Sequence, residues 1–129
     1  MLKILFGIFL ILHGLVHLLY FGQSHRLFEL QSGMVWPDES WVFSKLVGER
    51  TTRLLAGIAC IIAAAVFVAG GIGVLVGQAW WYPVVLGSTI YSSVIIIIFW
   101  DGKLQRLDDQ GFVGLLINLA VLVVSLVLF

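Results

Sequence analysis

The chain has 129 residues, of which 61% are hydrophobic and 11% are charged, and its net charge at neutral pH is zero. A soluble domain carries roughly 25% charged residues, so this chain has too little polar material to surround a core in water. Its composition, with a mean hydropathy of +1.12, indicates an integral membrane protein. The balanced charge offers no basic surface for nucleic acid, and the length suits a single membrane domain, residues 1–129.

Four long apolar stretches predict an all-α fold, an integral membrane four-helix bundle. In chain order the predicted spans are residues 4–21, 54–76, 84–100 and 112–129. A helix rises about 1.5 Å per residue, so each stretch can cross a hydrocarbon core of about 30 Å. A membrane β-barrel would need about eight or more alternating segments of ~10 residues, which this chain lacks.

The first stretch carries two histidines in a run without formal charge. His13 and His17 are four residues apart, so on a helix they lie one turn apart on one face. The same face continues with Phe6, Leu10, Tyr20 and Ser24. Imidazoles inside a membrane need partners, so we expect the other helices to pack against this face. No small-x-small cleavage site follows the stretch, so we expect it to be retained as a span.

The long connection between the first two stretches contains a predicted short helix. Pro37 interrupts the chain, Asp38 is a suitable N-cap, and Gly48 ends the segment. Residues 38–48 are therefore predicted to form an interfacial helix on the charged side of the bundle.

The second stretch presents small side chains at steps of four, Ala56, Cys60 and Ala64. Small residues allow membrane helices to approach closely, so Cys60 is interpreted as a packing residue. The glycines in residues 70–73 are interpreted as a loosened helix end. The uncharged residues 77–83, with two tryptophans and a tyrosine, are predicted to form a boundary loop before the third span.

A layer of polar side chains is predicted inside the bundle. Counting from the span midpoints places His13 level with Ser92 and Ser93, and His17 near Asn118. The layer comprises His13, His17, Ser92, Ser93 and Asn118, and Tyr91 joins it if its hydroxyl points inward.

This layer has a structural interpretation and a ligand-binding one. Interhelical hydrogen bonds of this kind fix the register of a bundle. A buried metal site is disfavoured because no Asp or Glu lies within a span and Cys60 is the single cysteine. Haem held by two histidines needs them on opposite faces of the ring, so it would have to be shared between subunits. A quinone or a lipid head needs only a hydrogen-bond partner and an apolar slot, which we expect near His17.

The basic residues predict the orientation in the plasma membrane. They are Lys3, Arg26, Lys45, Arg50, Arg53, Lys103 and Arg106. Four lie between the first and second spans and two between the third and fourth, on the same side of a four-span protein. The positive-inside rule then places both charged loops in the cytoplasm and both termini outside, although Lys3 beside the first span favours the reverse.

The layout resembles the DoxX-like group of small four-helix membrane proteins. The resemblance rests on the spacing of Gly7 and Gly14, the long first connection, the glycine-rich second span, and residues 108–118 leading into the last span. Members of that group resemble membrane subunits of a thiosulfate:quinone oxidoreductase. The resemblance implies a membrane subunit of a redox assembly and assigns no catalytic residue.

The sequence therefore favours a small accessory or anchor subunit of a membrane redox assembly with a quinone or lipid pocket. The alternative is a structural or interaction protein without a ligand, in a larger complex or a homo-oligomer. A third interpretation is a stand-alone enzyme acting on a lipid or quinone. The expected partners are membrane lipid and other membrane subunits or further copies of the chain.

The predicted orientation can be tested with reporter cysteines introduced into a Cys60→Ala background. Cysteines placed near Lys45 and Arg106 should react with an impermeant maleimide only from the cytoplasmic side. A cysteine near Gln78 should react only from the outside. The reverse pattern would show that Lys3 sets the orientation.

Overall fold

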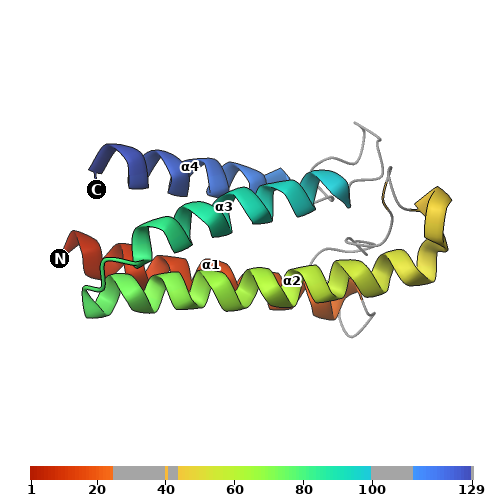
Figure 1. The fold of residues 1–129 in the computed structure, drawn as a ribbon, viewed down its shortest axis with the longest axis horizontal. Helices are drawn as coiled ribbons and strands as arrows, with labels where there is room; N and C mark the ends of the chain where they lie inside the picture. The colour runs from red at the N-terminus through yellow and green to blue at the C-terminus, as the bar shows by residue number, and fades with distance from the viewer. Residues whose placement is uncertain (25–39, 41–43, 100–111, 129) are drawn as a thin grey trace.

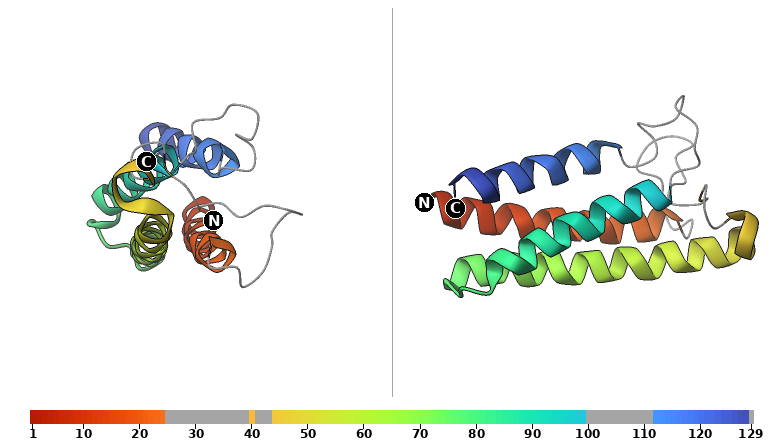
Figure 2. Two further views of the ribbon diagram at one scale, coloured as in Figure 1. Left: turned by 90° about the vertical axis from the view of Figure 1, so that its right-hand side faces the viewer. Right: turned by 45° about the horizontal axis from the view of Figure 1, so that its top comes forward.

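In the residues that it describes, the computed structural model is helical: residues 1–24, 40, 44–99 and 112–128 contain no strand. The helices are α1 (Leu2–Ser24), α2 (Ser44–Val76), α3 (Trp81–Ile98) and α4 (Phe112–Leu128). Close backbone contacts run between consecutive helices, and the beginning of α1 and the end of α4 lie at the same end of the molecule (Figure 1). Viewed end-on, the helices surround a common centre (Figure 2). The predicted all-α fold is confirmed.

Three helical segments are long and apolar enough to cross a membrane. They are Leu2–Gly22 in α1, Arg50–Val76 in α2 and the whole of α3, Trp81–Ile98. The apolar part of α4 among the described residues, Val113–Val127, is shorter. This finding is consistent with a membrane protein.

The second helix begins earlier than its predicted span and is broken near its start. Gly48 has non-helical angles (φ 82°, ψ 167°), and the segment before it turns away from the axis of α2 (Figure 1). The Thr52 Oγ1 hydroxyl donates a hydrogen bond of 2.7 Å to the Gly48 carbonyl. The predicted break at Gly48 is therefore confirmed, whereas residues 38, 39 and 41–43 of the predicted interfacial helix lie outside the described residues.

The third helix also begins earlier than predicted. Residues Trp81 to Pro83, which we expected in a boundary loop, form the first turn of α3. Proline is tolerated in a first turn because the backbone N–H that it lacks would have no partner within the helix. The turn that remains between α2 and α3, with Gly77 at φ 72°, is short.

The interpretation of residues 70–73 as a loosened helix end is wrong. The α2 helix continues through them to Val76, and their glycines are points of close helix contact. A Cβ atom on Gly71 would lie 2.7 Å from the Gly7 carbonyl oxygen of α1. A Cβ atom on Gly70 would lie 2.8 Å from a methyl group of Val85 in α3. Glycine allows α2 to approach both neighbours at once.

The predicted inward face of α1 is confirmed by its burial. Phe6, Leu10, His13, His17 and Tyr20 are all at most 8% exposed. The small residues Ala56, Cys60 and Ala64 of α2 are buried too, and Cys60 packs with Tyr20 and Ile96.

Large aliphatic side chains cover the outside of the structure. Leu12, Ile90 and Leu119 are 58%, 59% and 57% exposed, and many other leucines, isoleucines and valines are also exposed. A water-soluble protein rarely exposes apolar patches of this extent, so the surface suits contact with lipid chains.

Gly71→Ala should destabilise the fold, because the added methyl group meets the Gly7 backbone, which cannot rotate away as a side chain can. We expect a loss of about 1–3 kcal/mol, seen as a lower melting temperature in detergent. Gly87→Ala is the matched control, because no atom lies within 4 Å of the position that a methyl group would take on that helical glycine. The control should be neutral or slightly stabilising, since alanine favours helix by about 1 kcal/mol over glycine. Equal melting temperatures for the two variants would contradict the close contact.

Candidate functional site

The two histidines of α1 lie at the centre of the structure, sealed from its surface. His13 is 4% exposed and His17 is 1% exposed. Phe67 of α2 packs against both rings, with centroids 4.8 Å from His13 and 5.4 Å from His17. The two imidazoles meet edge to face, 5.2 Å apart. Aromatic packing therefore holds both rings in fixed orientations.

The hydrogen bond between His17 and the backbone of α1 fixes the tautomer of His17. Its Nδ1 lies 3.1 Å from the His13 carbonyl oxygen, which can only accept, so Nδ1 carries the proton. In the neutral ring Nε2 is then an acceptor, and it lies 2.7 Å from the Ser92 hydroxyl of α3. The Ser92 Oγ–H therefore donates to His17.

This assignment determines the orientation of the remaining side chains. Ser92 has used its one hydrogen, so its oxygen accepts the bond of 2.9 Å from the Asn118 amide of α4. The Asn118 carbonyl Oδ1 then faces His13 Nε2 at 2.7 Å, and His13 Nε2–H donates to it. The four side chains and the His13 carbonyl form a closed ring of hydrogen bonds, which we call the histidine ring.

A branch leads from the histidine ring toward the outside of the bundle. The Asn118 amide also donates a bond of 3.2 Å to Ser93, whose hydroxyl donates one of 2.8 Å to the Thr89 carbonyl. Every fully buried side-chain nitrogen and oxygen atom of the described residues has a hydrogen-bond partner. The arrangement pairs these polar groups while all of them are neutral, so it places no unpaired charge in the apolar interior, where such a charge would be costly.

The structure brings together five of the six predicted layer residues but pairs the histidines differently. His13 bonds to Asn118 and His17 to Ser92, so the levels counted from the predicted spans are wrong. The reason is that α3 runs from Trp81 to Ile98 rather than over residues 84–100, which moves Ser92 from the helix centre toward its end. Tyr91 lies apart, and its hydroxyl donates to the Ala59 carbonyl of α2 at 3.1 Å.

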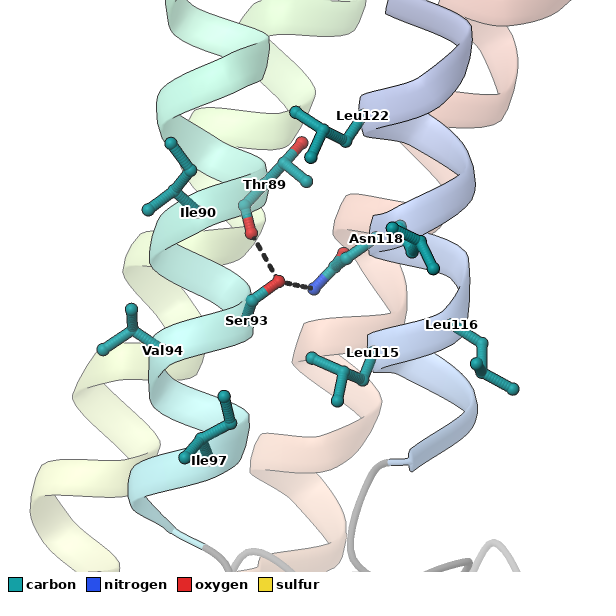
Figure 3. A pocket seen from close by; sticks show the side chains of 10 residues that line it. Thr89, Ile90, Ser93, Val94, Ile97, Leu115, Leu116, Asn118 and Leu122 are labelled. Atoms are coloured by element: carbon teal, nitrogen blue, oxygen red, sulfur yellow. Dashed lines mark hydrogen bonds between the residues drawn. The ribbon is translucent and has the colours of Figure 1, made fainter.

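A groove of about 380 Å³ lies between α3 and α4, and we call it the α3–α4 groove (Figure 3). Its polar lining residues are Thr89, Ser93 and Asn118. Its aliphatic lining residues are Ile90, Val94, Ile97, Leu115, Leu116, Leu119 and Leu122. Ser93 is partly exposed, and Figure 3 shows it bonded to Asn118 and to the Thr89 backbone. The groove therefore joins an apolar surface to the outer branch of the histidine ring.

The remaining predicted residues lie away from this groove. Neither histidine lines it, and neither lines two further grooves of about 320 Å³ each among the described residues. Tyr91 lines one of these, between α2 and α3. The aliphatic walls of the α3–α4 groove could not be predicted from the sequence, because a groove wall and a lipid-facing surface have the same composition. Within the described part of the chain no group of three His, Cys, Asp or Glu residues is placed to hold a metal ion.

Comparison with known proteins adds no relative: no family model, curated protein or solved structure matches the chain. The resemblance to the DoxX-like group therefore stays a prediction.

Asn118→Leu should be the most damaging change within the histidine ring. Leucine has a similar size but leaves His13 Nε2–H without an acceptor and removes the amide from both serines. We expect a loss of about 1–3 kcal/mol in unfolding free energy, measured in detergent. Ser125→Ala is the control on the same helix, because this buried serine bonds only to the Val121 carbonyl one turn earlier. Adding His13→Leu to Asn118→Leu should recover part of the loss, since both partners are then apolar. If the losses of unfolding free energy from the two substitutions simply add, the bond between His13 and Asn118 contributes nothing to stability.

Proposed function

We propose that the protein is a four-helix integral membrane bundle in which α1 to α4 each cross the bilayer. The support is the length and apolar character of α1, α2 and α3 and the packing of α4 along α3. The outward leucines, isoleucines and valines would face lipid, and the exposed charged residues Lys45 and Arg50 lie in the first part of α2. The orientation predicted from the basic residues belongs to this proposal.

Within that bundle we propose a binding site for a membrane-soluble ligand of the quinone class in the α3–α4 groove. The observation that carries this proposal is the meeting of aliphatic walls with Ser93 and Asn118 in one groove. An isoprenoid or alkyl tail would lie along the side chains of Val94, Ile97 and Leu119. The head would contact Ser93, the partly exposed polar side chain of the groove.

The histidines would act on this site through Asn118 rather than by touching the ligand. His13 holds the Asn118 carbonyl, and His17 holds Ser92, which accepts from the Asn118 amide. Together they fix the amide so that its second N–H points to Ser93. His13 and His17 are therefore positioning residues in this proposal.

A protein of this kind would serve as an accessory or anchor subunit that holds a quinone-class molecule for a membrane redox assembly. The redox assembly is suggested by the resemblance to the DoxX-like group, and the ligand site by the groove. Other membrane subunits, or further copies of the chain, would complete the assembly.

The second candidate is a structural membrane protein without a ligand. The observation that favours it is the complete internal pairing of the buried polar atoms among the described residues. Such a network can fix the register of α1, α3 and α4 without any ligand. The two candidates differ in whether blocking the α3–α4 groove changes what the protein binds.

The groove can be blocked by Val94→Trp, which places an indole among its aliphatic walls. The amount of quinone that co-purifies with the protein in mild detergent should then fall at least about tenfold, measured in solvent extracts by mass spectrometry. Ile72→Trp is the matched control, because Ile72 is as exposed as Val94 (46% and 45%) but lines none of the three grooves. Absence of quinone from the wild-type extract, or equal amounts in both variants, would favour the structural candidate.

A further inference from the structure

We infer that the α3–α4 groove selects the reduced ligand, a quinol with its hydroxyl groups, over the oxidised quinone. This inference rests on the proposed function and names the form of the ligand that the same site prefers. It follows from an inventory of hydrogen-bond donors and acceptors around the groove.

The donors that point toward the groove are all engaged within the protein. One Asn118 N–H is bonded to Ser92 and the other to Ser93. The Ser93 hydroxyl donates to the Thr89 carbonyl, and the Thr89 hydroxyl donates to the Val85 carbonyl at 2.8 Å. A quinone presents only carbonyl acceptors, so it finds no free donor among these side chains.

Acceptors remain available at the same place. A serine or threonine hydroxyl has two lone pairs and one hydrogen. Ser93 accepts one bond from Asn118, and one lone pair remains on its oxygen. Thr89, one turn earlier on the same wall, donates its hydrogen and also lines the groove. A quinol hydroxyl can donate to Ser93 without breaking any bond that the structure contains.

The histidine ring prevents the Asn118 amide from turning over and exchanging its donor and acceptor ends. If Asn118 were turned over, its carbonyl would face Ser92, whose single hydrogen is committed to His17. His17 cannot release it by changing tautomer, because its Nδ1–H is bonded to the backbone carbonyl of His13. The Asn118 amide therefore stays directed at both serines, and Ser93 stays an acceptor toward the groove.

Selective binding of the reduced form has a consequence for the bound redox couple. A ligand site that binds quinol about tenfold more tightly than quinone raises the two-electron midpoint potential by about 30 mV. The protein would then hold the quinone pool's reduced form and release the oxidised form.

The test compares three ligands that share the same ring and the same ten-carbon tail. They are the quinone, the quinol under anaerobic reducing conditions, and the quinol dimethyl ether. The ether keeps the ring, the tail and both oxygens of the quinol, and a methyl group replaces each donor hydrogen. Binding to the full chain in nanodiscs is measured by equilibrium dialysis. We expect the quinol to bind about five- to tenfold more tightly than the other two, which should bind alike.

Two variants assign the preference to Ser93. Ser93→Ala removes the acceptor and also frees the second Asn118 N–H, which can then donate to a quinone carbonyl, so the ratio of quinol affinity to quinone affinity should fall to about one or below. Ser88→Ala is the control, because this serine of α3 bonds to the Val84 carbonyl and lines the groove between α2 and α3 instead. Its ratio should equal that of the wild type.

The outcomes separate the inference from the proposed function. Equal binding of quinol and quinone, both lost in Val94→Trp, would overturn the inference and leave the proposed site standing. Tight binding of the dimethyl ether, or an unchanged ratio in Ser93→Ala, would overturn the donor argument in the same way. Failure of all three ligands to bind would overturn the proposed function together with the inference.

Discussion

The hydrogen bond from His17 Nδ1 to the His13 carbonyl is the constraint on which the interior depends. It is local to one turn of α1, yet it fixes a tautomer, and the tautomer fixes the hydroxyl of Ser92 on α3. Ser92 in turn fixes the amide of Asn118 on α4, and that amide returns to His13. One backbone carbonyl thereby orients polar groups on three helices without any formal charge.

Phe67 and the glycines of α1 explain how this helix can hold the ring at the centre. Gly14 directly follows His13, and a Cβ atom on Gly14 would lie 2.8 Å from the Cβ of Phe67. The backbones of α1 and α2 therefore approach closely enough for Phe67 to pack against both imidazoles. With α2 sealing one side, the polar groups of the ring can reach only toward α3 and α4.

The sequence predicted the helices and the members of the polar layer, but neither the pairing within the layer nor the groove. Periodicity identified the buried face of α1, because a histidine pair at i and i+4 can share only one face of a helix. The predicted pairing was wrong because it depended on the start of α3, and the aromatic residues before Pro83 suggested a loop. Tyr91 was expected in the layer only if its hydroxyl pointed inward, and it does not: one step of about 100° around α3 from Ser92 directs it to the Ala59 carbonyl of α2.

Asn118 connects the buried ring to the open groove, so a network whose polar atoms are all paired is compatible with the proposed ligand site. A ring that was complete and isolated would stabilise the bundle and do nothing else. Asn118 has two amide hydrogens, however, and the ring uses only one of them. The other is donated to Ser93 at the wall of the α3–α4 groove. The tautomer of His17 thereby determines, through Ser92 and Asn118, that Ser93 is an acceptor at the groove. A serine or threonine at position 118 would have one hydrogen and could not serve Ser92 and Ser93 together. The asparagine therefore links the buried ring to the proposed ligand site in one side chain, since one N–H bonds within the ring and the other bonds to the groove wall.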